Sequence, residues 1–580
     1  MGEIYIWADE QGQKRDYDHI RDILLEQDAA FMEYDKKKIS YLREENGFGL
    51  LISALEADIR QGNLDVYVDG HIENLPELRK ELQLSQTSSV EAVVRTAYER
   101  WEEEFPSRLK GDYAIVLRDK SKDQFICARA PFGVKAMYYY LDESACVFAT
   151  SQQKVLALKL LPVKFNWEYV AEYFANHETS VVKETPYCNW RVVLPGESLI
   201  IRKNDARRIA LWQPRVLKHT LGERETIERF RDLFVDSVKR KICDNVFPDY
   251  NFFLSGGLDS SSIACAFLHI PDFDPKRLHI YHDCHKEEID EYEMLKRGID
   301  DEAILAQKIC ERLGTPLHLR NGSQKNNLLK DFEPLQDFAD PDINILYGHS
   351  KWTGEKIPNY PFITGFGGDQ VAGRVVNIDR NHQINQSQYD MHMYEIYEEC
   401  LKPEFVARYS LRDRVNGKEG LGNYKTESQN IQWKTIFQNG QGVGRQQGYR
   451  FEIVSPFHDI DLVEYCVNLP DKYFNRKGVG KYILRKAFEK DLPPEIFIRK
   501  GKGTHVHTAY EGIKDNWGSI EKRYDHLKLA EYGIVDKEKF IGMMQRFRYG
   551  TEYHSLHVMK LLALELWLES KQSVFEGGMG

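Results

Sequence analysis

Short apolar runs separated by turn residues fill the region 1–200 of the chain. Such runs, bounded by glycine-containing pairs like Asp69-Gly70 and Phe132-Gly133, are typical of β-strands. They lie at 64–68, 114–118, 124–129, 136–140 and 198–201. Apolar residues at helical spacing occur at 90–103 and 168–176. This mixture predicts an α+β layered domain built on antiparallel sheet.

The pattern changes after 212–224, a stretch with weak periodicity and a proline that we interpret as a linker. Beyond it, strand-like and helix-like segments alternate. Strands are predicted at 250–254, 277–282, 318–319 and 362–364, and helices at 260–268 and 301–313. The alternation predicts a doubly wound parallel sheet, which binds ligands beyond the carboxyl ends of its strands. We therefore expect two domains, 1–211 and 225–580, the second ending in a helical tail.

Composition narrows the function classes. The chain has 580 residues, and 79 basic against 90 acidic side chains leave a net charge of −11, which argues against a nucleic-acid partner. No run reaches the roughly 20 apolar residues that a membrane helix needs, and the first residues lack a secretory signal pattern. Nine scattered cysteines without a C-x-x-C pair indicate reduced thiols. We expect a cytoplasmic globular protein without a membrane partner.

A glycine- and serine-rich heptad follows the strand expected at 250–254. It consists of Ser255, Gly256, Gly257, Leu258, Asp259, Ser260 and Ser261. Its glycines let the backbone approach an anion, and its hydroxyls and the next helix N-terminus supply donors. The carboxylate of Asp259 would repel a bound phosphate unless a cation lay between the two. Asp259 is therefore a Mg²⁺ ligand candidate. An ordinary capped turn uses similar residues, but the whole heptad after an apolar strand favours a phosphate site.

This heptad resembles the pyrophosphate loop of the asparagine-synthetase family of ATP-dependent amide-forming enzymes. It is not a Walker-type loop, because no G-K-[ST] follows. Segments 364–369 (TGFGGD), 450–457 (RFEIVSPF), 480–482 (GKY) and 500–503 (KGKG) resemble further family motifs. The resemblance implies ATP and Mg²⁺ as cofactors and a C-terminal adenylating domain. It implies that Asp259 and Asp369 bind the metal and that Gly367, Gly368 and Lys481 bind the phosphates. It also implies that Glu452 accepts the proton of the attacking amine and that Lys502 stabilises the oxyanion.

The chemistry of acyl adenylation explains these residue types. ATP and a carboxylate are both anionic, so metal and lysine charges must offset the charge that builds up between them. The attacking amine must lose a proton, which a carboxylate such as Glu452 can accept. Lys502 would then stabilise the tetrahedral oxyanion.

The first 210 residues resemble the glutamine-hydrolysing half of the same family, which implies an Ntn-hydrolase-like antiparallel sandwich. The similar segments are 69–74 (DGHIEN), 111–114 (GDYA), 128–135 (ARAPFGVK) and 148–151 (FATS). Glutamine-using members carry a cysteine nucleophile after the initiator Met. Here the second residue is Gly2, and the first cysteine is Cys127, in an apolar run that favours core packing. We therefore expect a retained scaffold without glutaminase activity.

Without glutamine hydrolysis, the amine must come with the substrate. Beta-lactam and carbapenam synthetases carry a tyrosine three residues before the metal aspartate, and ammonia-using members carry glutamate there. This chain has Phe366. The branch that remains is the lasso peptide cyclase, which implies a precursor peptide as substrate and a leader peptidase and leader-binding protein as partners. The apolar stretch 561–568 (LLALELWL) is compatible with a peptide site.

Two alternatives stay open. One is a small-molecule amide or lactam synthetase, either like beta-lactam synthetase or an ammonia-dependent asparagine synthetase. The other is a catalytically inactive scaffold. The retained set of acids and lysines argues against the scaffold, because an inactive site has no physical reason to keep those charges together.

Overall fold

The structure is a computed structural model. It describes residues 3–9, 40–45, 48–53, 60–143, 145–150, 152, 156, 161, 163–175, 184–202, 205–244, 247–284, 302–321, 358, 360–374, 386–416, 429, 432–433, 436, 452–499, 513–551 and 554–572.

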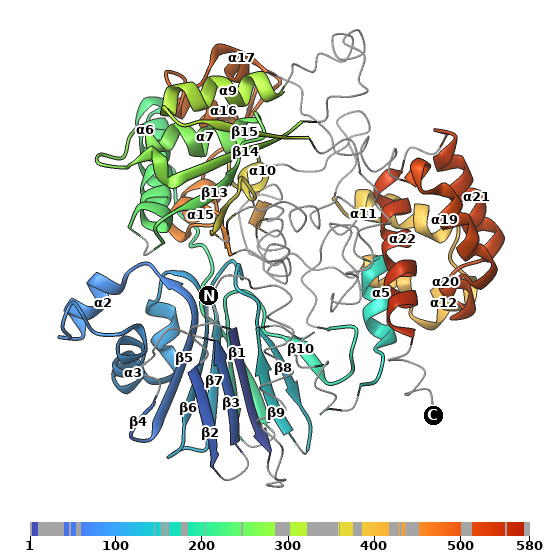
Figure 1. Cartoon of the computed structure of the whole chain (residues 1–580), viewed down its shortest axis with the longest axis horizontal. Helices are drawn as coiled ribbons and strands as arrows, with labels where there is room; N and C mark the ends of the chain where they lie inside the picture. The colour runs from blue at the N-terminus through green and yellow to red at the C-terminus, as the bar shows by residue number, and fades with distance from the viewer. Residues whose placement is uncertain are drawn as a thin grey trace.

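The N-terminal half is a sandwich of two antiparallel sheets (Figure 1). One sheet has the order β10-β8-β9-β1-β3-β2 and the other β12-β11-β7-β6-β5-β4. The first contains β10 (Trp190–Val192), β8 (Tyr138–Leu141), β9 (Ala145–Ala149), β1 (Glu3–Asp9), β3 (Phe48–Ser53) and β2 (Ser40–Glu45). The second contains β12 (Asp205–Ala210), β11 (Glu197–Arg202), β7 (Gln124–Arg129), β6 (Gly111–Asp119), β5 (Leu64–Ile72) and β4 (Arg60–Gln61). All five strands predicted in this half are present as β5, β6, β7, β8 and β11.

Apolar side chains between the two sheets form the sandwich core. Tyr67, Val116 and Cys127 of one sheet pack with Tyr139 and Phe148 of the other. The outer face of the β5–β6–β7 sheet is covered by α2 (Leu75–Glu81) and α3 (Val90–Trp101). Because both faces are covered, β5 and β7 are buried along most of their length instead of alternating.

The C-terminal half contains the predicted parallel sheet, with the order β15-β14-β13-β16-β17. Its strands are β13 (Tyr250–Phe253), β14 (Leu278–Cys284), β15 (Leu317–Asn321), β16 (Phe362–Ile363) and β17 (Ile453–Val454). Helices α6 (Glu223–Val238), α7 (Leu258–Phe267), α9 (Glu302–Leu313), α10 (Gly368–Val371), α15 (Ile460–Val467), α16 (Tyr482–Ala487) and α17 (Pro494–Ile498) accompany it. The fold class predicted from the sequence is confirmed.

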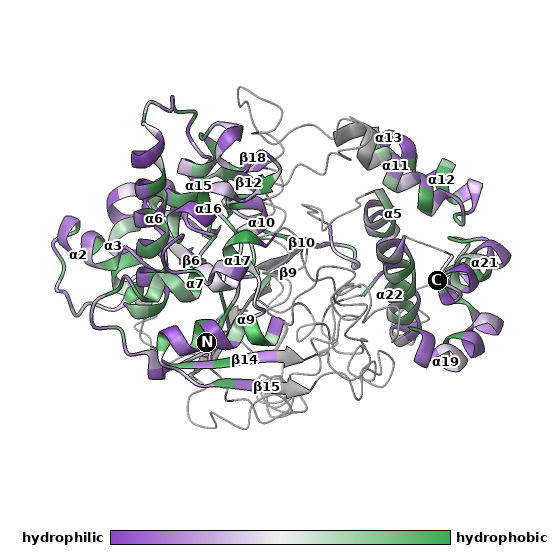
Figure 2. Cartoon of the chain, turned by 90° about the horizontal axis from the view of Figure 1, so that it is seen from above, coloured by the Kyte–Doolittle hydropathy of each residue, from purple (hydrophilic) through white to green (hydrophobic). Residues whose placement is uncertain are grey.

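A lobe of helices lies beside these two bodies (Figures 1 and 2). It contains α5 (Trp167–Ala175), α11 (Gln386–Glu398), α12 (Pro403–Arg408), α13 (Leu411–Asn416), α19 (Trp517–Glu521), α20 (Lys528–Glu531), α21 (Lys537–Arg548) and α22 (Ser555–Ser570). The stretch 561–568 lies in α22, and each of its residues is at most 3% exposed. These side chains pack inside the protein, as is typical of a helix that is apolar on most sides, and this burial leaves them no surface with which to line a peptide site.

The apolar core runs across the predicted domain boundary. Helix α5 precedes residue 211, yet it packs in one cluster with β8, β9 and α22. Tyr173 of α5 donates to the carbonyl of Lys560 at 2.9 Å, and the Lys560 ammonium donates back to the Tyr173 carbonyl at 2.7 Å. Residues 212–222 form neither helix nor strand, and Trp212 among them packs on Phe132 and Trp433. The division at 1–211 and 225–580 stays a prediction.

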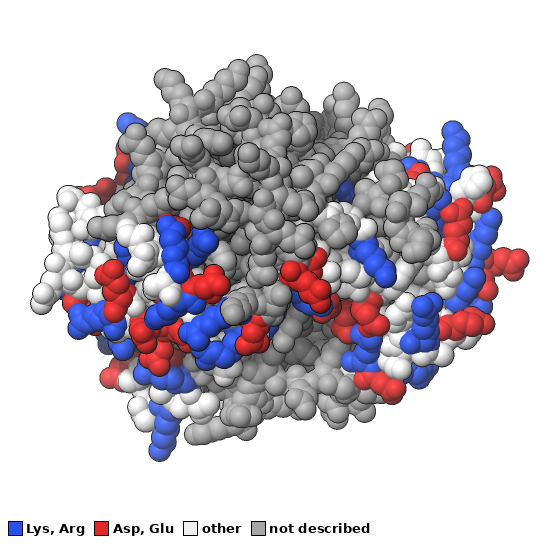
Figure 3. Space-filling view, turned by 90° about the horizontal axis from the view of Figure 1, so that it is seen from below, with Lys and Arg blue, Asp and Glu red and all other residues white. Residues whose placement is uncertain are grey.

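Charges on the described surface are mixed in sign. Acidic and basic side chains intersperse over the face drawn in Figure 3. Within the described ranges, no helix has both the length and the apolarity required to span a bilayer.

A buried arginine at the end of β7 holds the loop that leads toward the other half. Arg129 is 1% exposed. It donates to the carbonyls of Lys135 at 2.6 Å, Val193 at 2.7 Å and Gly133 at 2.6 Å. One side chain therefore satisfies three buried carbonyls that no β-ladder reaches.

Replacing this arginine should destabilise the protein. Arg129→Met leaves the three carbonyls unsatisfied, and each such group costs about 1–3 kcal/mol, so the free energy of unfolding should fall by about 3 kcal/mol or more. Denaturant unfolding followed by circular dichroism measures the change. Arg224→Met, the same substitution at an exposed arginine of α6, should leave the transition unmoved. Equal midpoints for both variants would show that Arg129 is not structural.

Candidate active site

Two loops meet where the strand order of the parallel sheet reverses. The chain runs from β13 outward to β14 and β15, and then returns to the other side of β13 with β16 and β17. The heptad 255–261 follows β13, and the segment 364–369 follows β16, its direct neighbour. Ligands of open α/β sheets bind at this kind of switch point, beyond the carboxyl ends of the strands.

The first loop gathers hydroxyls at a helix N-terminus. The Ser255 and Ser260 hydroxyl oxygens lie 3.1 Å apart, and the backbone N–H of Gly257 donates to Ser255 Oγ at 3.3 Å. Gly257 is also the residue before the first turn of α7. The partial positive charge of α7 thus lies beside two hydroxyl donors, an arrangement that suits a phosphate.

Glycines let the two loops approach each other closely. A Cβ on Gly368 would come within 2.5 Å of Asp259 Cγ, and one on Gly256, whose φ is +71°, within 2.5 Å of the Glu302 carbonyl oxygen. Only glycine fits such contacts, and only glycine adopts this φ without strain. The glycines therefore bring Asp259 against the second loop.

A lysine joins the two loops. Lys481 Nζ lies 2.6 Å from Asp259 Oδ1 and 2.7 Å from Asp369 Oδ1. Burial alone would lower the pKa of Lys481, but the two carboxylates raise it above its ordinary value, so the amine stays charged. Three of the predicted site residues, far apart in the sequence, therefore form one ionic cluster.

The backbone at this lysine is left-handed. Lys481 has φ +53° and precedes α16, directly after the short hairpin of β18 (Asn475–Arg476) and β19 (Val479–Gly480). For a residue with a side chain this conformation costs about 1–2 kcal/mol, so it persists only where contacts hold it. The ion pairs with Asp259 and Asp369 are such contacts.

The donor set of this cluster fits Mg²⁺. Mg²⁺ is usually held by one or two carboxylates together with substrate phosphates. Asp259 and Asp369 already approach a common cation, the Lys481 ammonium. Among the described residues, no group of three or more His, Cys, Asp or Glu side chains is placed to hold a metal. A nucleotide's phosphates and water would be the natural further ligands for such a metal.

Glu452 lies in a second cluster. It immediately precedes β17 and is 9% exposed. Its Oε1 is 3.2 Å from the Nζ of Lys135, a residue of the N-terminal half, and Lys135 is also 3.2 Å from Asp69 Oδ1. Lys135 and Asp69 lie in the motifs 128–135 and 69–74, but neither residue is among the predicted site residues. The only signal for them in the sequence is that both belong to amidotransferase-like motifs.

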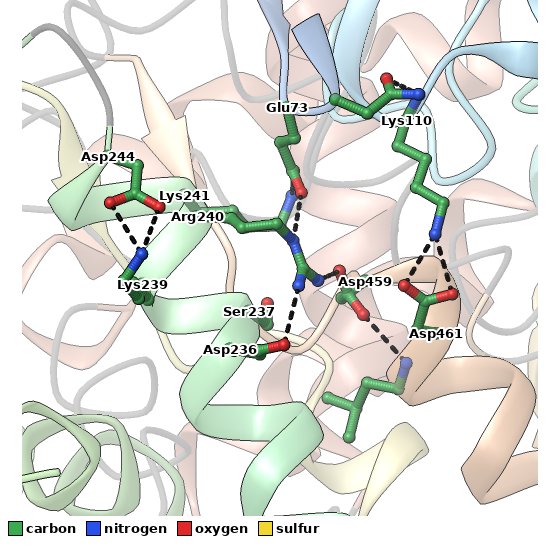
Figure 4. Close-up of polar contacts among 12 residues, drawn as sticks. Glu73, Lys110, Asp236, Ser237, Lys239, Arg240, Lys241, Asp244, Asp459 and Asp461 are labelled. Carbon is green, nitrogen blue, oxygen red and sulfur yellow. Dashed lines mark hydrogen bonds and ion pairs between the residues drawn. The ribbon is translucent and has the colours of Figure 1, made fainter. Parts of the chain in front are cut away.

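Further ion pairs join the two halves beside this cluster (Figure 4). Arg240 lies 3.3 Å from Glu73 and 2.6 Å from Asp459, while Lys241 lies 2.8 Å from Glu73 and 2.6 Å from Asp112. Burial would raise the pKa of Glu73, but Lys241 and Arg240 hold it below its usual value. The interface between the halves is thus charged, paired and buried.

The remaining predicted residues divide into three groups. Leu258 packs against the apolar core of the sheet domain, and Ser261, in the first turn of α7, is fully buried. Lys502 lies outside the described residues. Cys127 is fully buried in the sandwich core, where burial raises the pKa of its thiol, so the expectation of core packing is confirmed.

Most of the chain resembles known proteins. Residues 229–438 and 449–569 match the family model described as asparagine synthase, and residues 58–212 match one described as a glutamine amidotransferase domain. The chain is 26% identical over 516 residues to asparagine synthetase [glutamine-hydrolyzing] 3 of Bacillus subtilis, covering 83% of this chain and 81% of that protein. It is 28% identical to asparagine synthetase [glutamine-hydrolyzing] 2 of the same organism, covering 88% and 72%. It is 26% identical to amidase chry2 of Gibberella zeae, covering 49% and 43%.

Asp259 offers a direct test of the site. Asp259→Asn removes a charge from the loop cluster and no core group, so it should weaken binding of Mg²⁺·ATP about tenfold to a hundredfold, the equivalent of one charged hydrogen bond. Calorimetric titration measures the loss, and thermal unfolding should stay unchanged. Asp244→Asn, at an exposed ion pair with Lys239, is the matched control and should bind normally. Wild-type binding by the Asp259→Asn variant would contradict the assignment.

Proposed function

Because this chain belongs to the asparagine synthase family of ATP-dependent amide-forming ligases, we propose that it is a lasso peptide cyclase. It adenylates an Asp or Glu side chain of a precursor core peptide and joins that side chain to the peptide's N-terminal amine. The products are a macrolactam, AMP and pyrophosphate. A leader peptidase and a leader-binding protein would supply the trimmed peptide, and the reaction would take place in the cytoplasm.

The source of the amine carries this proposal. No cysteine precedes Cys127 in the printed sequence, and Cys127 is buried in the sandwich core. A buried thiol with a raised pKa is a poor nucleophile, so we do not expect Cys127 to release ammonia from glutamine. If the substrate itself carries the amine, the reaction needs no ammonia from glutamine.

Phe366 supports a substrate of this kind. It stands three residues before Asp369, where small-ring synthetases are expected to carry tyrosine and ammonia-using enzymes glutamate. Its carbonyl accepts from the Ser455 hydroxyl at 2.9 Å, and its partly buried ring packs against the apolar core. A phenyl ring neither takes nor relays a proton, so proton transfer falls to another group, which we assign as Glu452.

In this proposal, the loop residues, Lys481, Glu452 and Lys502 have different roles in the reaction. The α7 N-terminus and the hydroxyls of Ser255 and Ser260 would bind the phosphates, and Lys481 would turn from the carboxylates toward them. Mg²⁺, when bound, supplies charge that offsets the pyrophosphate as it leaves. The substrate carboxylate attacks the α-phosphorus, and pyrophosphate departs. The amine then attacks the acyl carbon, Glu452 accepts its proton, and AMP leaves with Lys502 at the oxyanion.

A small-molecule amide synthetase is the second candidate. The Bacillus subtilis relatives are named asparagine synthetases, and they match this chain over most of its length. Such an enzyme would share the adenylation step and differ only in the acid and the amine. Both candidate enzymes would use ATP in the same way, so only the acid and the amine that react can distinguish them.

An acceptor screen separates them. Purified protein receives Mg²⁺·ATP with either a library of leaderless peptides that carry an internal Asp or Glu, or aspartate with ammonia. We expect pyrophosphate and AMP with some peptides, and loss of one water from those peptides by mass spectrometry. Turnover with aspartate and ammonia, together with none from any peptide, would refute the cyclase proposal.

The front half gives an independent prediction. Incubation with glutamine and Mg²⁺·ATP should release no glutamate, because the only early cysteine is inaccessible. The matched control is Cys127→Ser, and both proteins should give the same background in a coupled glutamate assay. Glutamate release that disappears in Cys127→Ser would show that this thiol reacts after all.

A further inference from the structure

An ion pair supports the phosphate loop from behind. Arg499 directly follows α17, and its Nη2 lies 2.7 Å from Oε1 of Glu302, the first residue of α9. We propose that Arg499 and Glu302 are positioning residues, whose ion pair holds Gly256 and Lys481 at the spacing that a nucleotide's phosphates require. This inference rests on the proposed function, because it takes the heptad 255–261 as the ATP site.

The heptad contacts the first turn of α9. A Cβ on Gly256 would lie 2.5 Å from the Glu302 carbonyl oxygen and 3.3 Å from the Glu302 Cα, so no space separates the loop from this turn. A shift of the turn would therefore displace the loop. The N–H groups in the first turn of a helix lack partners within the helix, so side-chain contacts matter most at this end. The ion pair with Arg499 is such a contact.

A second arginine connects Arg499 to the lysine of the site. Arg485 of α16 donates to the Arg499 carbonyl at 2.6 Å and to the Gly480 carbonyl at 3.0 Å. Gly480 precedes Lys481, whose ammonium lies 2.6 Å from Asp259 Oδ1 in the heptad. These contacts form a closed ring that starts and ends in the heptad. Its members are Gly256, Glu302, Arg499, Arg485, Gly480, Lys481 and Asp259.

The stability of the fold does not by itself explain this ion pair. Helices α9 and α17 are already joined by Lys308 and Glu495, whose side chains are 39% and 43% exposed. The Arg499 side chain is only 7% exposed, and its Nε has no hydrogen-bond partner among the described residues. Burying a charge and leaving a donor unsatisfied both cost stability, and apolar side chains often stabilise such a contact equally well. We therefore relate the Arg499–Glu302 pair to the geometry of the loop and not to the strength of the helix contact.

Substitution of either partner should weaken nucleotide binding. Arg499→Met and Glu302→Met should each raise the dissociation constant of Mg²⁺·ATP about threefold to thirtyfold, because the loop and Lys481 lose their fixed spacing. The double variant should bind no worse than either single variant, since both substitutions remove the same contact. The matched control is Lys308→Met, which breaks the other ion pair between the same two helices and should bind like the wild type.

Two measurements test the proposal. Calorimetric titration with Mg²⁺·ATP gives the dissociation constants. Hydrogen–deuterium exchange without nucleotide reports on the heptad backbone, which should exchange about tenfold faster in Arg499→Met and at the wild-type rate in Lys308→Met. Weaker binding by Arg499→Met and Glu302→Met, but not by Lys308→Met, supports the proposal. Wild-type binding by the first two variants, losses that add in the double variant, or an equal loss in Lys308→Met overturns it.

The outcomes remain separable from those of the proposed function. If the wild-type protein does not bind Mg²⁺·ATP, the proposed function fails, and hydrogen exchange of the heptad alone decides whether Arg499 positions the loop. If the wild type binds Mg²⁺·ATP and Arg499→Met binds it equally well, only the positioning role fails. Should Arg499→Met not fold, Glu302→Met decides in its place, because the Glu302 side chain is 27% exposed and easier to replace.

Discussion

One shared cation organises the candidate site. Asp259 follows β13 and Asp369 follows β16, and both contact the ammonium of Lys481. Two carboxylates held this close repel each other unless a positive charge lies between them. The two loops can therefore meet at the switch point only with a cation present, either the lysine or a metal. The glycines in both loops remove the steric barrier, and the lysine removes the electrostatic one.

A second set of charges joins the two halves. Lys135, Lys241 and Arg240 each contact carboxylates across the interface. Paired and buried charges require defined geometry, because an unpaired charge in this position would cost several kcal/mol. The front half therefore keeps a fixed orientation to Glu452 even though its only early thiol is buried.

The sequence allowed the strands and the loop chemistry to be predicted, but not the contacts between distant segments. Strands such as β7 and the heptad 255–261 carry local signals: apolar runs, glycines and hydroxyls. The pairing of Lys135 with Glu452 depends on how two domains dock, and no local pattern encodes docking. The stretch 561–568 is a second example, because an apolar helix has the same sequence pattern whether it lines a binding site or packs in a core. The structure buries it.

The mutual hydrogen bonds of Tyr173 and Lys560 have an evolutionary consequence. They lie in a core to which both ends of the gene contribute. A deletion that removed the front half would strip one wall from α22 and expose leucines to water. Selection for a folded ligase half would therefore also preserve the front half, whatever chemistry the front half performs.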